Sequence, residues 1–138
     1  MPAYQAALLD GKPFDLAAER PGKVVFLNVW ATWCGPCRFE IPELEKMHAK
    51  YAARGFEVVG VSVDENGAEA VKPFVSEQSI GYPIVLDPPG KIANVLQTTV
   101  LPTSVLIDRN GKIVWRRIGA LMGPDATLDA AIEKALGK

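Results

Sequence analysis

The chain has two cysteines, Cys34 and Cys37, which are separated only by Gly35 and Pro36. Thiols at this spacing can form a cross-link, bind a metal ion or react with disulfides. A disulfide across so short a loop removes less chain entropy than one that closes a long loop. A chain of 138 residues can also bury enough surface to be stable without a cross-link. We therefore expect a chemical role for the pair rather than a purely structural one.

Metal binding is the competing use of two cysteines at this spacing. A structural zinc site needs four ligands, and the chain offers two thiols and one histidine. His48 lies eleven residues beyond Cys37 on the same predicted helix, which separates the two by about 16 Å along the axis. The histidine therefore cannot close a site with the thiols. The sequence predicts neither a metal ion nor an organic cofactor.

The sequence around the cysteines favours a reactive thiolate at Cys34. This residue follows an apolar run and stands where a helical pattern begins. Free backbone N–H groups and the helix dipole stabilise an anion at such a position, and the thiolate is the form that attacks a disulfide. Pro36 is tolerated in the first turn, where its missing N–H would have no helical partner. Cys37 lies one turn further on, within reach of a mixed disulfide on Cys34.

The elements that position the cysteines follow from hydrophobic patterning. Nearly continuous apolar runs over 24–30 and 56–63 predict two strands that are buried on both faces. Between the two strands, four apolar residues recur at intervals that predict a helix with one apolar face. They are Phe39, Leu44, Met47 and Tyr51. We expect Pro42 to kink this helix and Gly55 to end it.

Weaker signals predict the remaining elements. In chain order, they are a hairpin over 6–17 turning at Asp10-Gly11, a helix over 68–79, a strand over 82–87, a turn over 87–90, a short helix over 92–97, an antiparallel hairpin over 103–118 and a helix over 124–136. Strands that alternate with helices predict a mixed α/β sheet covered by helices. The length predicts a single domain over residues 1–138.

The charge pattern and the apolar runs exclude some function classes. The formal net charge is −1 and Lys and Arg are dispersed, so no nucleic-acid partner is predicted. No apolar run approaches the roughly 20 residues of a membrane span. No basic segment followed by an apolar one marks a signal peptide. The start, MPAYQAALLDGKPFDL, is compatible with a native start and with a cut after an N-terminal signal or anchor.

Two segments carry a family resemblance that covers nearly the whole chain. WCGPC, between a buried strand and a proline-containing helix, resembles thioredoxin, and LPTSVLIDRNGKIV resembles the cis-proline loop and hairpin of that fold. The match is closer to the TlpA/ResA-like branch, which includes the cytochrome c maturation thioredoxins. The segment GKVVFLNVWATWCGPCRFEIPEL, a helix and strand inserted at about 66–87, and LIDRNGKIV all resemble that branch.

The resemblance implies a fold and a set of substrate contacts. The fold would be a thioredoxin fold with an N-terminal hairpin and a central helix-strand insertion. The resemblance also implies a cis bond at Leu101–Pro102, which is affordable because a proline follows. Without the resemblance, Pro102 is simply a proline at the start of a strand. The backbone before that proline would pair with an extended substrate segment. Leu101 and Pro102, together with Gly35 and Pro36, would form the substrate-binding surface. Trp33 belongs either to this surface or to the core.

The resemblance also points to a group that handles protons. Asn28 occupies the strand position where thioredoxin usually has a buried acid, and an asparagine cannot take up a proton. In the ResA-like pattern a glutamate follows the next strand, and Glu65 matches that position. The neighbouring Asp64 is an alternative candidate for this role. A further alternative is that both acids are simply exposed to solvent.

By resemblance, we expect a monomeric thiol–disulfide oxidoreductase in which Cys34 attacks and Cys37 resolves. It would reduce disulfides in selected extracytoplasmic partners, such as apocytochromes or copper-site assembly proteins, with electrons from an upstream reductase. The place of action would be the periplasm or another extracytoplasmic compartment. The alternatives are a general cytoplasmic thioredoxin, a non-catalytic binding module on the same fold and a copper chaperone.

Overall fold

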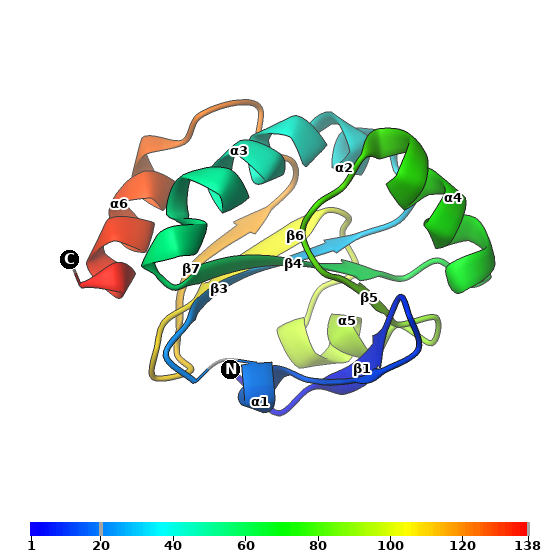
Figure 1. Cartoon of the computed structure of the whole chain (residues 1–138), viewed down its shortest axis with the longest axis horizontal. Helices are drawn as coiled ribbons and strands as arrows, with labels where there is room; N and C mark the ends of the chain where they lie inside the picture. Colours follow the sequence, from blue (N-terminus) through cyan, green and yellow to red (C-terminus); the bar gives the residue numbers. More distant parts are fainter. Residues whose placement is uncertain (20, 138) are drawn as a thin grey trace.

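The computed structural model describes residues 1–19 and 21–137 (Figure 1). The strands are Gln5–Leu8 (β1), Pro13–Asp15 (β2), Val24–Trp30 (β3), Phe56–Ser62 (β4), Ile84–Leu86 (β5), Thr103–Ile107 (β6) and Ile113–Ile118 (β7). The α-helices are Leu16–Glu19 (α1), Gly35–Phe39 (α2), Ile41–Tyr51 (α3), Ala68–Gln78 (α4), Lys91–Leu96 (α5) and Ala126–Leu136 (α6), and Ala52–Arg54 (η1) is a 3-10 helix.

The strands of the described residues form one mixed sheet in the order β2-β1-β5-β4-β3-β6-β7. The central strands β3, β4 and β5 run parallel, and the other pairs are antiparallel. The predicted α/β architecture is therefore confirmed. The N-terminal hairpin is β1–β2. The predicted insertion consists of α4 and β5, and β5 lies in the sheet between β4 and β1.

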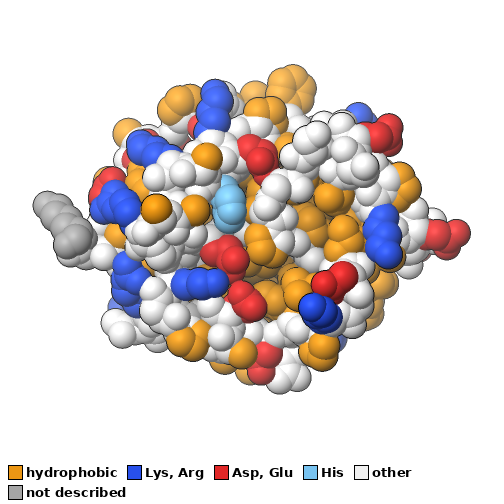
Figure 2. Space-filling model, viewed as in Figure 1, with side chains coloured by type: hydrophobic (Ala, Val, Ile, Leu, Met, Phe, Trp, Pro, Cys, Tyr) orange, Lys and Arg blue, Asp and Glu red, His pale blue; other side chains and the backbone are white. Residues whose placement is uncertain are grey.

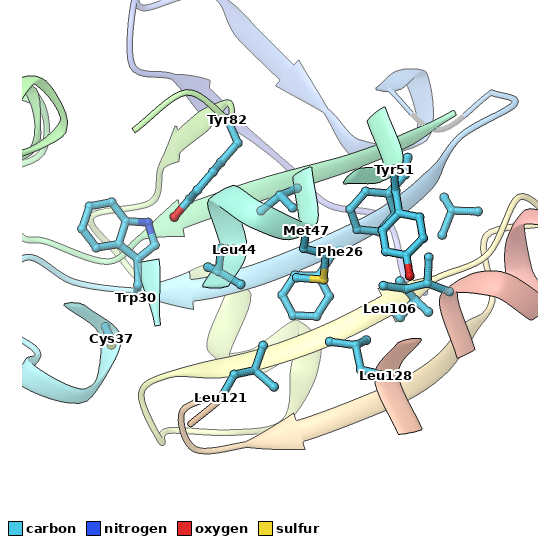
Figure 3. Close-up of a cluster of buried hydrophobic side chains, with 14 of the residues drawn as sticks. Phe26, Trp30, Cys37, Leu44, Met47, Tyr51, Tyr82, Leu106, Leu121 and Leu128 are labelled. Atoms are coloured by element: carbon cyan, nitrogen blue, oxygen red, sulfur yellow. The ribbon is translucent and has the colours of Figure 1, made fainter. Parts of the chain in front are cut away.

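The core lies on both faces of this sheet. β3 is buried along its whole length, as its apolar run predicts. Its alternate residues belong to two different clusters of buried side chains. Phe26 and Trp30 pack on the face covered by α2, α3, α4 and α6. Leu27 and Val29 pack on the opposite face, where α1 and α5 lie (Figure 1). Figure 3 shows the first cluster, which reaches Cys37 at one end.

The helix that follows the cysteines differs from the prediction in one respect. It is broken into α2 and α3 at Glu40 (φ −88, ψ −8), and Pro42 lies in the first turn of α3 instead of kinking a helix interior. Leu44, Met47 and Tyr51 are buried as predicted. Phe39 is 77% exposed, so its placement on the buried face was wrong. The break explains this, because Phe39 ends α2 and does not share the stripe of α3.

The face shown in Figure 2 carries basic and acidic side chains interspersed around an apolar hollow. A groove lined by Leu8, Leu9, Asp10, Lys72, Pro83 and Ile84 lies where β1 and β5 meet α4. In the part of the chain that the structure describes, no helix has the length and apolar character required to cross a membrane.

The start of α6 provides a test of local stability. Asp125 is its N-cap, and Oδ1 accepts hydrogen bonds from the N–H groups of Thr127 at 2.9 Å and Leu128 at 3.0 Å. We expect Asp125→Ala to lower the free energy of unfolding by about 1 kcal/mol. Asp125→Asn keeps the acceptor and should lose much less. Urea unfolding of the three proteins measures this. An equal loss in both variants would show that the ion pair with Arg117 matters more than the cap.

Candidate active site

Cys34 and Cys37 form a disulfide where β3 passes into α2. Cys34 is the N-cap of α2 and has an extended backbone (φ −88, ψ 106). Its Sγ accepts a hydrogen bond from the backbone N–H of Cys37 at 3.2 Å. The predicted position of Cys34 at a helix start is therefore confirmed. In the reduced state, an N–H group aimed at this sulfur would stabilise a negative charge on it.

The two cysteines differ in their access to solvent. Cys34 is 6% exposed and Cys37 is 1% exposed. Cys37 lies in the buried cluster that also contains Trp30 and Leu44 (Figure 3). A disulfide of another protein can therefore reach Cys34 more readily than Cys37.

The predicted cis peptide bond between Leu101 and Pro102 is confirmed. The register of the antiparallel pair β3–β6 places Thr103 opposite Val29. Pro102 therefore lies at the end of β3 that leads into the cysteine loop. The carbonyl of Pro102 accepts a hydrogen bond from the N–H of Gly119 at 2.8 Å, which fixes the loop against the end of β7.

A buried carboxylate that the sequence reasoning missed stands at the end of α2, three residues after Cys37. Glu40 is fully buried. Its Oε1 accepts a hydrogen bond from Nδ2 of Asn28 at 2.6 Å, and its Oε2 accepts one from the N–H of Leu121 at 2.9 Å. Nδ2 of Asn28 also donates to Oγ of Ser104 at 3.0 Å. At the strand position where thioredoxin usually has a buried acid, this chain has Asn28, which donates a hydrogen bond to the buried acid Glu40.

The electrostatic surroundings of Glu40 alter its ionisation. Burial raises the pKa of Glu40 above the ordinary glutamate value, although the N–H of Leu121, the amide of Asn28 and the charge of Arg117 partly oppose the rise. The sequence carried a signal for this residue. Glu40 lies three residues after Cys37 and continues the spacing of Leu44, Met47 and Tyr51 as an acid within an apolar stripe.

The structure places the two acids after β4 in different surroundings. Glu65, the residue that the resemblance favoured for handling protons, is exposed. Asp64 is buried and accepts hydrogen bonds from Thr32 and from Ser62. Of the alternatives left open, Asp64 is therefore the buried acid, and the alternative that both acids are solvated is wrong for Asp64.

Exposed apolar side chains surround the disulfide. Trp33, for which core and surface positions were both open, is 70% exposed. Phe39 and Met122, 77% and 80% exposed, line a groove of about 750 Å³. The groove is lined by Gly35, Pro36, Arg38, Phe39, Pro42, Gln78 and Met122. Such a surface fits an apolar segment of another chain. The sequence reasoning missed Phe39 and Met122, whose exposure depends on the helix break and on the loop after β7.

Comparison with known proteins places these features in a family. The sequence profile of the Redoxin family matches residues 1–132. The thiol-disulfide oxidoreductase ResA of Bacillus anthracis is 39% identical over 118 residues, which cover 86% of this chain and 67% of that protein. ResA of Bacillus subtilis (strain 168) is 36% identical over 105 residues, covering 76% of this chain and 58% of that protein.

Solved structures show the same fold. A thiol:disulfide interchange protein of the thioredoxin family from Chlorobium tepidum TLS is 34% identical and has a TM-score of 0.81, with 99% of this chain and 94% of that chain covered. A secreted thiol-disulfide isomerase from Corynebacterium glutamicum is 26% identical and has a TM-score of 0.86, with 100% and 86% covered. The expected thioredoxin fold is therefore confirmed.

The raised pKa of Glu40 predicts a pH-dependent stability. Between the ordinary value of 4.5 and the higher pKa in the folded state, the native protein binds more protons at Glu40 than the unfolded chain does. The free energy of unfolding should therefore fall as pH rises through this interval. Glu40→Gln should lack that contribution, so its stability relative to the wild type should improve with rising pH.

Urea unfolding of the oxidised proteins from about pH 4 to pH 8 measures the difference. The contribution of other groups, such as Glu57, whose pKa burial also raises, is common to both proteins and cancels. Parallel stability curves for the wild type and Glu40→Gln would contradict the assignment of a raised pKa to Glu40.

Proposed function

The chain belongs to the Redoxin family and is a TlpA/ResA-like thiol–disulfide oxidoreductase, and we propose that it reduces disulfides in selected extracytoplasmic proteins through Cys34 and Cys37. The observation that carries this proposal is the arrangement of the pair. The more accessible cysteine stands at the helix start with a backbone N–H directed at its sulfur, and the buried one lies one turn further on.

The proposed reaction transfers two electrons in two exchange steps. The thiolate of Cys34 attacks a partner disulfide, forms a mixed disulfide and releases one partner thiolate. Cys37 then loses its proton and attacks the Sγ of Cys34. This second step forms the Cys34–Cys37 disulfide and releases the second partner sulfur as a thiolate, which is protonated. An upstream dithiol reductase must return two electrons and two protons before the next cycle.

We assign substrate binding to the surface around the disulfide. Trp33, Gly35 and Pro36 are exposed beside Cys34, and the loop Leu101–Pro102 lies at the same end of the sheet. Pairing of an extended partner segment with the backbone of Leu101 would bring a partner cysteine toward Cys34. The exposed side chains of Phe39 and Met122 favour a partner segment with apolar residues near its cysteine.

We propose that Glu40, and not Glu65, exchanges the proton of the resolving cysteine. Glu40 lies three residues after Cys37, which is one turn along the helix, and both side chains are buried. The resolving step requires a thiolate at Cys37, a residue with almost no access to water. A neighbouring carboxylate whose pKa burial raises can accept this proton and later release it.

The partners and the compartment are proposed from the relatives. Proteins of the ResA type and a secreted isomerase are among the similar proteins, which supports an extracytoplasmic site of action. Apocytochromes and copper-site assembly proteins are the partner classes we propose, and a monomer is the proposed state. Adducts trapped on Cys37→Ser in the native host test this. Adducts with cytoplasmic proteins alone would favour a general cytoplasmic thioredoxin.

Two further alternatives differ in what they predict for the purified protein. A non-catalytic binding module would leave the reduction of insulin by dithiothreitol unaccelerated. A copper chaperone would bind copper stoichiometrically as the reduced monomer. An oxidoreductase should accelerate insulin reduction, and this acceleration should require both cysteines.

The two cysteines should behave differently when each is replaced. We expect reduced Cys37→Ser to accumulate a mixed disulfide with a peptide disulfide, because the resolving thiol is missing. Cys34→Ser should accumulate little, because Cys37 is buried. Mass spectrometry after an acid quench quantifies the adducts. Equal trapping by the two variants would remove the assignment of Cys34 as the attacking residue.

Replacement of Glu40 should slow the second step more than the first. Glu40→Gln cannot accept the proton of Cys37, so the mixed disulfide should persist longer by a factor on the order of 10². Glu43→Gln, which removes a carboxylate from the partly exposed face of α3, is the matched control. Rapid mixing with a peptide disulfide followed by acid quenching gives both rates. An unchanged lifetime in Glu40→Gln would exclude Glu40 from proton transfer.

A further inference from the structure

We propose that Asp64 is a positioning residue that acts on Cys34 through Thr32 and shifts the dithiol–disulfide equilibrium of the site toward the disulfide. This inference rests on the proposed function of the cysteine pair. It assigns to Asp64 a role that is distinct from proton transfer, which we place at Glu40.

The geometry ties Asp64 to the loop that precedes Cys34. Oδ1 and Oδ2 of Asp64 lie 3.0 Å and 3.2 Å from the backbone N of Thr32, and Oδ2 also accepts a hydrogen bond from Oγ1 of Thr32 at 2.5 Å. Thr32 stands two residues before Cys34, whose own N–H donates to the carbonyl of Ala31 at 3.2 Å. The hydrogen bonds of Asp64 therefore hold the turn from which Cys34 projects.

The other side of Asp64 is fixed to the sheet. Its Oδ1 accepts a hydrogen bond from Oγ of Ser62 at 2.6 Å, and the same Oγ accepts one from the backbone N–H of Asp64 at 3.1 Å. Ser62 is the last residue of β4, and Asp64 is 3% exposed. The hydrogen bonds of Asp64 thus anchor the loop of Cys34 to the end of β4.

The hydrogen-bonding pattern suits a negative charge at this position. All the side-chain contacts of Asp64 described above come from donors, and an ionised carboxylate accepts only. Thr32 and Cys34 are two residues apart, so their Cα atoms are separated by at most about 7 Å, and the carboxylate bonded to the N–H of Thr32 lies within roughly 12 Å of the Cα of Cys34. A charge buried in this neighbourhood disfavours a thiolate on Cys34, which exists only in the reduced protein. The charge therefore favours the disulfide and makes the pair a stronger reductant.

Equilibration with glutathione tests the effect of the charge. In this reaction the dithiol and oxidised glutathione convert to the disulfide and two molecules of reduced glutathione. We expect Asp64→Asn to lower the equilibrium constant for disulfide formation about tenfold, which corresponds to about 30 mV. Glu69→Gln, which removes an exposed carboxylate from the nearby start of α4, should leave the constant unchanged. A constant within twofold of the wild type in Asp64→Asn would overturn the proposal, as would an equal shift in Glu69→Gln.

A second pair of variants tests the contact with Thr32 and keeps the proposal testable if Asp64→Asn does not fold. Thr32→Val removes the hydroxyl donor and retains the charge of Asp64. It should slow the formation of the mixed disulfide at Cys34 by at least threefold, and Thr32→Ser should restore the rate. Equal rates in the wild type and Thr32→Val would overturn the positioning role. The glutathione equilibrium can be measured even if the protein fails to reduce insulin, so failure of the proposed function is distinguishable from failure of this inference.

Discussion

The hydrogen bonds that Glu40 accepts are the interaction on which the arrangement at the end of α2 depends. Through Asn28 they reach the central strand β3, and through Leu121 they reach the loop between β7 and α6. Burial of a carboxylate is costly, and two donors offset the cost only in part, so the pKa of Glu40 stays raised. An apolar side chain would fill the same space without this cost. The presence of an acid one turn from Cys37 is therefore better explained by proton exchange than by packing.

The cysteine pair is subject to opposing electrostatic influences. The backbone N–H of Cys37, 3.2 Å from Sγ of Cys34, favours a thiolate. The carboxylate of Asp64, which is bonded to the loop before Cys34, disfavours it. Because the thiolate exists only in the reduced protein, the balance between these groups helps set the reduction potential. The Gly-Pro dipeptide between the cysteines cannot set it alone.

Local patterning predicted the strands and most helices and was insufficient to predict the helix break and the polar contacts. The apolar run over 24–30 predicted β3 correctly, because a strand buried on both faces has no polar alternation. The burial of Leu44, Met47 and Tyr51 was also predicted correctly from their spacing, whereas the cis bond before Pro102 was predicted from the family resemblance. The break at Glu40 was missed because its buried side chain depends on partners far away in the sequence. Asp64 is buried because Thr32, on another segment, and Ser62 supply hydrogen-bond donors to its carboxylate.

Strand direction explains why distant segments meet at one end of the sheet. β4 runs parallel to β3, so the end of β4, with Asp64, lies beside the end of β3, with the cysteine loop. β6 runs antiparallel to β3, so its start brings Pro102 to the same place. The chemistry of the site is thus fixed by three central strands, at the end of the sheet where parallel strands commonly carry sites.

The inserted α4 instead contributes to the surface. Its Gln78 lines the groove beside the disulfide, and the ring centroid of its Phe74 lies 5.6 Å from the guanidinium carbon of Arg38. Changes in α4 can therefore alter which partner binds and leave the reacting groups in place.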